Sequence, residues 1–381
     1  MDLNLDVEEL IQLRHLLHEN AETSNNEEKT AKIIVEFLED LKPDEIWSNQ
    51  GGHGVIAVFK GKEPGENIGF RADTDALHIA ETIHLEYASK TPHTAHKCGH
   101  DGHMTMVAGI AAYLKNNPVQ KGNVYLLFQP AEETGEGAER INKALKDLDI
   151  HLDYIFGLHN LPDFPKGKIL SKSGTFAAAS RGMVIKLFGK TSHAAEPEFG
   201  ISPVLAMAKI TTQMTNLHKE LDFSSLALAT VIHAELGEIA FGTTPGYAEI
   251  RVTLRAMKDE DMEILIEEAE NLARKHCEDE GLGCEISYTE IFPSTENSEE
   301  TVNILKQSAS SMGLDYVPLE KPFKWSEDFG HYKLQSQTGF FGLGSGVECA
   351  HLHDEFYDFP DDIIPMGVKM YIGLMKYFKV I

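Results

Sequence analysis

The chain contains the stretch Val124-Tyr125-Leu126-Leu127-Phe128-Gln129-Pro130-Ala131-Glu132-Glu133. Its first six residues predict a short hydrophobic strand. The carboxylates of Glu132 and Glu133 come just after the strand's carboxyl end, where α/β folds gather ligands and catalytic groups. Adjacent side chains point in different directions, so one carboxylate can bind a metal ion while the other moves protons. A solvated pair of surface glutamates is the alternative interpretation.

Polar side chains follow two further predicted strands in the same way. Asp73 and Asp75 come just after a strand over Asn67–Ala72, and His159 follows a strand over Tyr154–Leu158. Three separate strands therefore bring Asp, Glu and His side chains to one edge of a sheet. This coincidence indicates a functional site more strongly than any one of the motifs does alone.

The order of the predicted elements indicates an α/β fold in which helices cover a sheet. The predicted strands are Gly54–Lys60, Asn67–Ala72, Val124–Gln129 and Tyr154–Leu158. The predicted helices are Val7–Leu17, Ile33–Leu41, Met104–Leu114 and Glu136–Lys146. A later helix over Glu299–Met312, a strand over Thr338–Leu343 and a helix from Asp361 return to the same domain. We therefore expect a first domain made of residues 1–180 and 294–381.

A different pattern occupies residues 181–293. The predicted elements are the strand Met183–Phe188, the helix Ser202–Leu217, the strands Leu226–Ile232 and Ala248–Leu254, the helix Glu260–Lys275 and the strand Cys284–Thr289. The order βαββαβ is that of the split-βαβ, ferredoxin-like fold. The sequence therefore predicts a small domain inserted into the first one.

The composition excludes several classes of partner. The 381 residues include 60 acidic and 34 basic side chains, which gives a formal net charge of −26. Contacts with phosphate need an excess of Lys and Arg, so we expect neither nucleic acid nor an anionic membrane as partner. Four cysteines without a CxxC pair are too few for a disulfide framework. With neither a basic secretory n-region nor an apolar run of about 18 residues, a cytoplasmic location is expected.

Residues 93–103 hold the densest group of possible metal ligands, namely His93, His96, Cys98, His100, Asp101 and His103. Thiolate and imidazole are ligands that borderline-soft divalent metals prefer. On non-helical backbone ahead of the helix at Met104, Cys98 and His100 could present both donor atoms to one side. A histidine-rich surface loop is the alternative, and we do not expect every histidine here to be a ligand.

A second histidine pair lies near the end of the chain. His351 and His353 stand just past a predicted strand, and either could be a metal ligand. Cys349, close by, is expected to fill buried space. The HExxH motif is absent, which excludes a thermolysin-like protease.

Six motifs occur in order along nearly the whole chain: Arg71–Leu77, Cys98–His103, Gln129–Glu133, Gly157–His159, Gly189–Pro197 and Ser326–Phe329. Together they resemble the two-metal amidohydrolases, a family that includes hippurate hydrolase, bacterial aminoacylases, N-acetyldiaminopimelate deacetylase and plant indoleacetyl-amino-acid hydrolases. The resemblance implies a catalytic domain with zinc-exopeptidase-like architecture. It also implies that the inserted domain serves as a lid or dimerisation domain, so that the protein forms a homodimer or a higher homo-oligomer.

The resemblance also implies a role for each residue that matches the family's motifs. The implied metal ligands are Cys98, His100, Glu133, His159 and His353, and they would hold one or two divalent ions (Zn, Mn, Co or Ni) per subunit. His353 is preferred to His351 because it stands four residues before Tyr357-Asp358-Phe359. Glu132 becomes the general base. His193 resembles the histidine that completes the active site, typically that of the partner subunit, and Asp101 is expected to orient a ligand.

The chain departs from the family pattern at two informative places. Leu77 is followed by His78, where the family usually has proline. The inserted domain often carries an Asn in Asn-Val-Ile-Pro, which is thought to hold the substrate carboxylate. The matching stretch here is Gly242-Thr243-Thr244-Pro245, so the amide donor is missing.

These observations predict a metal-dependent amidohydrolase that acts on small N-acyl amino acids or related amide conjugates. Water activated by metal would lose a proton to Glu132 and attack the acyl carbon, while His193 stabilises the oxyanion. A metal-dependent dipeptidase or carboxypeptidase is the nearest alternative. A thiol hydrolase built on Cys98 and His100 and a non-catalytic metal-binding protein are the others.

Overall fold

The structure is a computed structural model that describes residues 5–381, which form two compact units. Of the described residues, the first unit comprises 5–176, Thr295–Pro322 and Asp328–Ile381. The second comprises Ala177–Ser294 and Phe323–Glu327. The domain boundaries predicted at residues 181 and 293 stay predictions. The short segment Phe323–Glu327 of the second unit was not foreseen.

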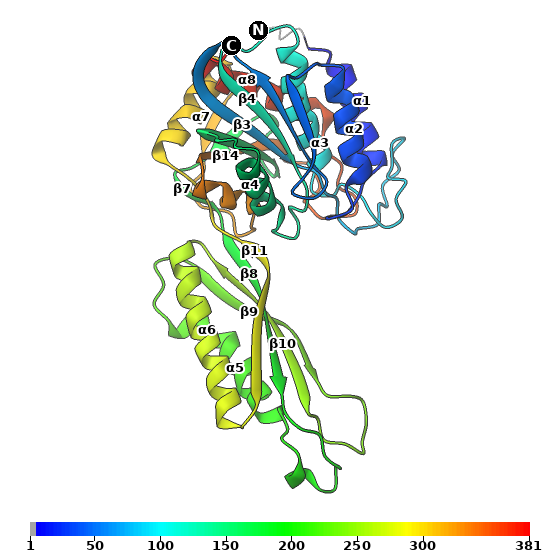
Figure 1. The fold of residues 1–381 in the computed structure, drawn as a ribbon, viewed down its shortest axis with the longest axis vertical. Coiled ribbons are helices and arrows are strands. Elements are labelled where there is room, and N and C mark those ends of the chain that lie inside the picture. The colour runs from blue at the N-terminus through cyan, green and yellow to red at the C-terminus, as the bar shows by residue number, and fades with distance from the viewer. Residues whose placement is uncertain (1–4) are drawn as a thin grey trace. The chain divides into compact units, whose positions relative to one another are not determined.

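The first unit is built on one eight-stranded sheet with the order β1-β2-β4-β3-β5-β14-β6-β13 (Figure 1). Its strands are β1 (Glu45–Gln50), β2 (Gly54–Lys60), β3 (Glu63–Asp73), β4 (Lys121–Gln129), β5 (Tyr154–Pro162), β6 (Ile169–Ser171), β13 (Tyr316–Pro318) and β14 (Gln337–Gly346). Strands β4, β3, β5 and β14 are neighbours and run parallel. Their carboxyl ends therefore meet at one edge, as predicted for β3, β4 and β5.

Among the described residues, the first unit has six α-helices: α1 (Val7–Glu19), α2 (Glu28–Glu39), α3 (His100–Leu114), α4 (Gly137–Asp147), α7 (Glu299–Ser311) and α8 (Ile364–Tyr377). Helix α3 packs against α1, α8 and the sheet. Val107 of α3, Val368 of α8 and the strand residues Phe70, Leu126 and Phe341 are fully buried in one hydrophobic core. This burial of apolar side chains between sheet and helices stabilises the unit and confirms the predicted α/β fold class.

The start of α3 differs from the prediction. The helix was expected from Met104, but it begins at His100. Gly99 precedes it with φ = +91°, a left-handed conformation that glycine adopts without strain. His100 and Asp101 therefore lie in the first helical turn, and of the pair Cys98 and His100 only Cys98 lies on non-helical backbone.

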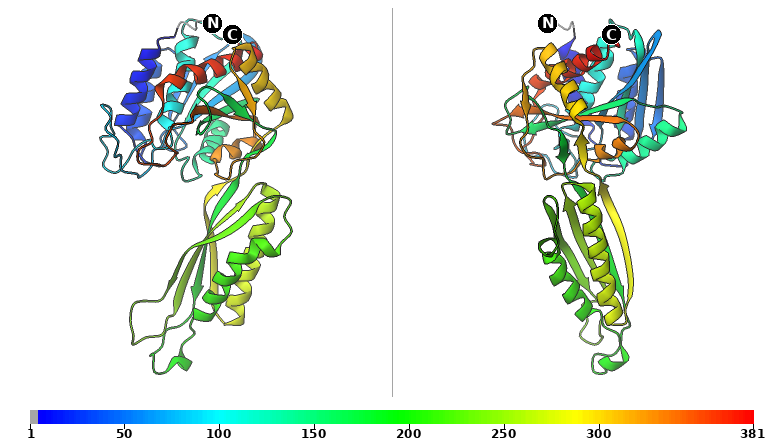
Figure 2. Two further views of the ribbon diagram at one scale, coloured as in Figure 1. Left: turned by 180° about the vertical axis from the view of Figure 1, so that it is seen from behind. Right: turned by 90° about the vertical axis from the view of Figure 1, so that its left-hand side faces the viewer.

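The second unit contains β8 (Ala179–Phe188), α5 (Val204–Glu220), β9 (Ala227–Leu236), β10 (Tyr247–Ala256), α6 (Asp259–Asp279) and β11 (Gly283–Phe292), in that order. Its antiparallel sheet has the strand order β11-β8-β10-β9, which together with the order βαββαβ is the predicted ferredoxin-like arrangement. Figure 2 shows α5 and α6 side by side on one face of this sheet. Met183, Ile210, Ile250 and Leu265 form part of the core between them.

Within residues 5–381, no helix combines the length and the apolar character needed to cross a membrane.

Gly102 offers a test of the packing next to the metal-ligand candidates. A Cβ atom at this position of α3 would lie 2.4 Å from the ring of Phe359. Gly102→Ala should therefore lower the free energy of unfolding by about 1–3 kcal/mol, although alanine favours a helix more than glycine does. Urea unfolding followed by circular dichroism measures the change.

Gly242→Ala is the matched control, because a Cβ atom there meets nothing within 4 Å. Adding Phe359→Leu to Gly102→Ala should recover part of the loss. A Gly102→Ala protein as stable as the wild type would contradict the packing of α3 against Phe359.

Candidate metal centre

The structure brings the five predicted ligands of the first unit together. They come from the turn before α3 (Cys98), its first residue (His100), the turn after β4 (Glu133), β5 (His159) and the segment after β14 (His353). The ligand atoms of Cys98, His100 and His159 lie within 4.8 Å of one another, and so do those of Cys98, Glu133 and His353. His351 instead is exposed beside Asp163. The geometry therefore favours His353 as the last ligand.

Individual distances show how tightly these atoms cluster. The Sγ atom of Cys98 lies 3.4 Å from Nε2 of His159. The Oε1 atom of Glu133 lies 3.8 Å from Nε2 of His100 and 3.7 Å from Nε2 of His353. The side chains thus converge on a common space although they are spread over most of the chain.

Gly99 is required for this arrangement. A Cβ atom at Gly99 would lie 2.6 Å from Oδ1 of Asn160 and 2.8 Å from the hydroxyl of Tyr357. The close approach and the positive φ together exclude any larger residue without a shift of the backbone. The turn at Gly99 places Cys98 and His100 against the end of β5.

Asp75 positions two of the ligands, a role that was not predicted. Its backbone carbonyl accepts a hydrogen bond from Nδ1 of His100 at 2.8 Å, which leaves Nε2 free to face the carboxylates of Asp73 at 3.5 Å and Glu133 at 3.8 Å. Its carboxylate accepts hydrogen bonds from the backbone N–H of Glu133 at 3.0 Å and from the hydroxyl of Ser24 at 2.6 Å. The predicted place of Asp75 at the sheet edge was the one signal of this role in the sequence.

The expectation for Asp101 is wrong. Its carboxylate contacts Arg14 at 3.1 Å and Nδ1 of His18 at 2.8 Å, both on α1. Burial opposes ionisation of Asp101, but the hydrogen bond from His18 and the charge of Arg14 hold its pKa well below the usual range. Asp101 therefore fastens α3 to α1 instead of orienting a ligand.

A buried network around Arg71 supports the same edge of the sheet. The guanidinium of Arg71 donates hydrogen bonds to Gln129 at 2.8 Å, to Asp73 at 3.0 Å and to Asp328 at 2.7 Å. Asp328 also accepts hydrogen bonds from Nε2 of Gln129 and from the backbone N–H of Ala138. The sequence indicated Asp328 only as part of a motif. Its hydrogen bonds could not be predicted, because a partner such as Gln129 lies about 200 residues away.

The donor atoms fit a divalent cation. Nε2 of His100 and Oε1 of Glu133 are buried, and neither finds a hydrogen-bond partner among residues 5–381. Burial opposes the charge on His100, but Asp73, Asp75 and Glu133 raise its pKa to about 10. The cluster is thus strongly attractive to positive charge. Thiolate, imidazole and carboxylate together suit Zn, Mn, Co or Ni.

Glu132 lies at the same place as the ligand candidates. One of its oxygens belongs to a group within 4.8 Å that includes His100 and Glu133. Its side chain is buried, and the backbone N–H of Asp328 approaches its Oε1 at 3.4 Å. A carboxylate beside a metal-ligand cluster can hold and transfer a proton there.

His193 belongs to the second unit, on the loop between β8 and α5, so the geometry of the first unit does not include it. Its Nδ1 accepts a hydrogen bond from the backbone N–H of Ala195 at 3.1 Å. The backbone N–H of Ala194 donates to the carbonyl of Gly242 at 3.0 Å. The histidine loop and the stretch that departs from the family pattern are therefore neighbours.

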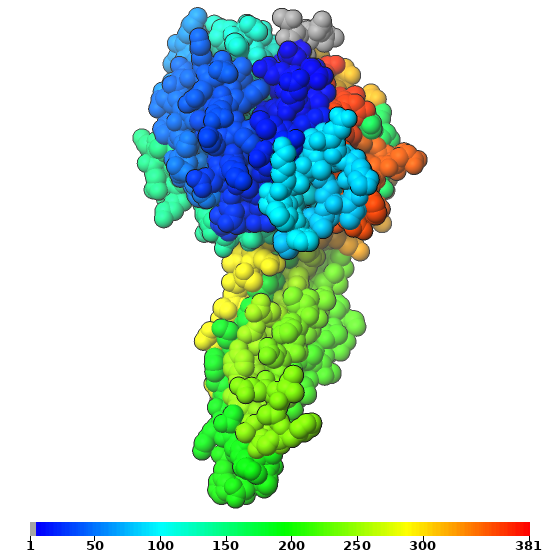
Figure 3. All heavy atoms as spheres, turned by 90° about the vertical axis from the view of Figure 1, so that its right-hand side faces the viewer, coloured from blue at the N-terminus to red at the C-terminus, as the bar shows by residue number. Residues whose placement is uncertain are grey.

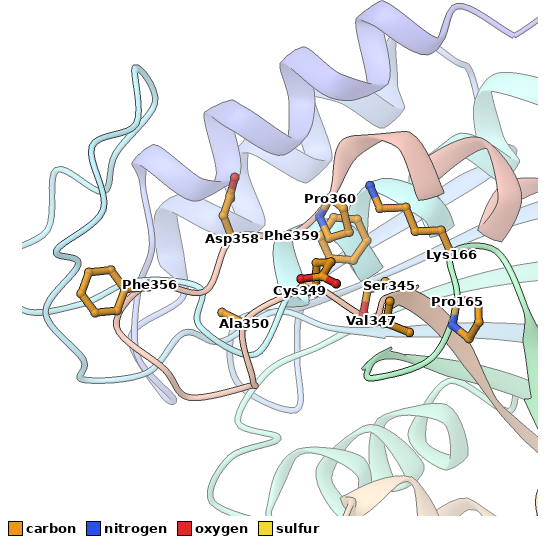
Figure 4. Close-up of a pocket in the computed structure, with 12 residues that line it drawn as sticks. Pro165, Lys166, Ser345, Val347, Cys349, Ala350, Phe356, Asp358, Phe359 and Pro360 are labelled. Carbon is orange, nitrogen blue, oxygen red and sulfur yellow. The ribbon is translucent and has the colours of Figure 1, made fainter.

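A pocket of about 620 Å³ lies beside the segment that leads to His353. It is lined by residues 345–350, by Phe356 and Asp358–Pro360 and, from the other side, by Pro165 and Lys166 (Figure 4). Cys349 is partly buried and packs against the hydrophobic core, as expected of a residue that fills space, and it also lines this pocket.

Known proteins resemble this chain along its whole length. N-acetyldiaminopimelate deacetylase of Listeria monocytogenes is 29% identical over 375 residues, which cover 97% of this chain and 99% of that protein. N-acetylcysteine deacetylase of Bacillus subtilis is 33% identical over 346 residues, which cover 90% of each. The crystal structure of the YXEP protein of Bacillus subtilis, a dinuclear metal binding peptidase from the M20 family, is 28% identical and superimposes with a TM-score of 0.82, covering 98% of this chain and 99% of that one.

The model of peptidase family M20/M25/M40 matches residues 69–377. This match and the deacetylase relatives confirm the family recognised from the motifs and the predicted metal-dependent amidohydrolase. The structural similarity confirms the α/β fold class. The chain therefore belongs to peptidase family M20/M25/M40.

Proposed function

We propose that this protein hydrolyses the amide bond of small N-acyl amino acids or related amide conjugates. The observation that carries the proposal is the position of Glu132, a buried carboxylate whose oxygen lies within 4.8 Å of the ligand atoms of His100 and Glu133. A site that only stored metal would have no use for a base at this position. The deacetylase relatives, whose names specify N-acetylated amino acids, support the substrate class.

Five side chains would hold one or two divalent ions (Zn, Mn, Co or Ni): Cys98, His100, Glu133, His159 and His353. When bound, the ions would acidify the attacking water and polarise the acyl oxygen. Asp75 keeps His100 and Glu133 in place for this purpose. Such hydrogen-bond partners of metal ligands typically tune both orientation and affinity.

Glu132 would act as general base and then as general acid. Its carboxylate takes the proton from the attacking water, and it returns this proton to the leaving amine. Its burial keeps bulk water away and favours direct proton transfer. His193 would donate a hydrogen bond to the oxyanion that forms on the acyl carbon.

The substrate carboxylate would be held differently from the usual family pattern. Gly242 offers no side-chain amide, so backbone groups of its stretch or other side chains must bind this carboxylate.

A panel of N-acetyl amino acids, N-benzoyl amino acids and dipeptides, assayed after loading with each metal, tests the substrate class. Fast hydrolysis of dipeptides with no activity on the N-acyl compounds would indicate a dipeptidase instead.

The second unit would serve as lid and dimerisation domain, with His193 completing the site of the partner subunit in a homodimer. The excess of acidic residues supports a small-molecule substrate over nucleic acid or membrane and is consistent with a cytoplasmic location.

Two substitutions distinguish the proposed general base from the proposed metal ligands. Glu132→Gln should lower kcat by about 10²–10⁴-fold and leave the metal content unchanged, because it removes a proton acceptor and no ligand. Cys98→Ser should lose metal as well as activity, since a hydroxyl is a much poorer ligand than a thiolate. Steady-state kinetics and elemental analysis of both purified variants give the two readouts. A Glu132→Gln enzyme with wild-type kcat would rule out the proposed base.

Mixing of inactive subunits tests the role of His193. His193→Ala and Glu132→Gln proteins, unfolded together and refolded, should form mixed dimers in which one site has both an intact Glu132 and the partner's intact histidine. Random association would restore up to about one quarter of the wild-type activity. The two variants refolded separately are the control. Complete absence of recovery, with dimers verified by light scattering, would favour a site built within a single chain.

A further inference from the structure

His353 lies on an exposed segment. Local hydrogen bonds form a turn at Asp354, and the backbone N–H of Thr82 lies 3.5 Å from the carbonyl of Glu355. His353, Asp354, Glu355 and Phe356 are all exposed, whereas Tyr357 is buried. The side chain of His353 is 51% exposed, and its backbone has φ = +66°. An exposed segment in an unfavourable backbone conformation keeps its shape only if neighbouring groups fix it.

Lys97 fixes both ends of this segment. Its backbone carbonyl accepts a hydrogen bond from the backbone N–H of His353 at 2.8 Å. Its Nζ donates a hydrogen bond to the backbone carbonyl of Tyr357 at 2.7 Å. Lys97 is fully buried and precedes Cys98 directly, so one residue connects the His353 segment to the turn that carries another ligand.

The buried ammonium group of Lys97 forms an ion pair with Glu81, which is itself hydrogen-bonded to other groups. Its Nζ lies 2.6 Å from Oε1 of Glu81, which also contacts Nε2 of His18 at 3.0 Å. The second oxygen of Glu81 accepts a hydrogen bond from the backbone N–H of Ser89 at 2.9 Å. Figure 3 shows the cyan segment beside the dark blue N-terminal part of the chain, on the same face of the first unit. The carboxylate of Glu81 is thus held by other partners, and Nζ of Lys97 also reaches the carbonyl of Tyr357.

We infer that Lys97 is a positioning residue for the metal centre: its side chain locks the His353–Tyr357 segment so that His353 is held ready to bind metal. This inference rests on the proposed function, in which His353 is a ligand. Without the Nζ contact, the exposed segment would have to be ordered at the moment of binding, and metal affinity would fall by the cost of that ordering.

Titration of the protein with Co²⁺ tests this inference. Lys97→Met keeps the length of the side chain and removes its charge and its N–H donors. It should bind Co²⁺ about 10-fold more weakly, a loss typical of groups that orient metal ligands. Lys90→Met is the matched control, because Lys90 pairs with Glu19 at the surface of the same stretch and does not touch His353–Tyr357. It should bind Co²⁺ as the wild type does.

The double variant distinguishes positioning from a merely structural role. If Lys97 acts through His353, adding Lys97→Met to His353→Ala should weaken Co²⁺ binding little further. Losses of Co²⁺ affinity that simply add, or wild-type affinity in Lys97→Met, would overturn the inference.

If Lys97→Met alone does not fold, the double variant Lys97→Met with Glu81→Gln, which removes both charges of the ion pair, takes its place. A wild-type protein that binds no Co²⁺ would overturn the proposed function together with the inference, whereas normal wild-type binding with an unaffected Lys97→Met overturns the inference alone.

Discussion

Arg71 joins the ends of two parallel strands through a guanidinium that is fully buried. It bonds to Gln129 at the end of β4 and to Asp328 of the 3₁₀-helix Asp328–Leu334, and Asp328 binds the first turn of α4. Such a buried charge is tolerated only when each partner stays in place, because removal of one partner leaves the others unpaired at a cost of several kcal/mol. The network reaches the candidate metal centre at two places. Glu133 stands in the turn that follows Gln129, and Asp73 lies 3.5 Å from Nε2 of His100. The geometry of the candidate centre therefore depends in part on these buried ion pairs.

Much of the fold could be predicted from local sequence pattern. Strand β2 begins and ends where its hydrophobic run predicts, and the order βαββαβ of the second unit follows from alternating periodicities. Strand β1 was not predicted, because its residues face mostly solvent and it is defined by pairing with β2. Strands β6 and β13 have three residues each and pair across nearly 150 positions, which no local pattern can indicate. The periodicity of a local sequence does not show which distant segments pair with each other.

The candidate site also has a part that could be predicted from the sequence and a part that could not. The five candidate ligands and the candidate base Glu132 were predicted through motifs, because motifs specify residue types at a fixed spacing. The contacts around these side chains were not predicted, since Asp75 bonds to Glu133 and Lys97 bonds to Tyr357, both distant in sequence. For the same reason the link from Asp101 to α1 was not predicted. The start of α3 at His100 likewise depends on Gly99, whose conformation is set by close contact with Asn160 and Tyr357. The residue types in the sequence can thus predict the chemistry of the site, whereas the orientation of its side chains is known only from the structure.

The position of β14 has a consequence for the synthesis of the protein. This strand lies inside the sheet, between β5 and β6, although it comes about 170 residues later in the chain. A ribosome must therefore release most of the polypeptide before the sheet can close, and the segment that carries His353 emerges later still. The candidate ligands Cys98, His100, Glu133 and His159 therefore leave the ribosome before His353 has been synthesised, so the full set of five can assemble only when translation is nearly complete.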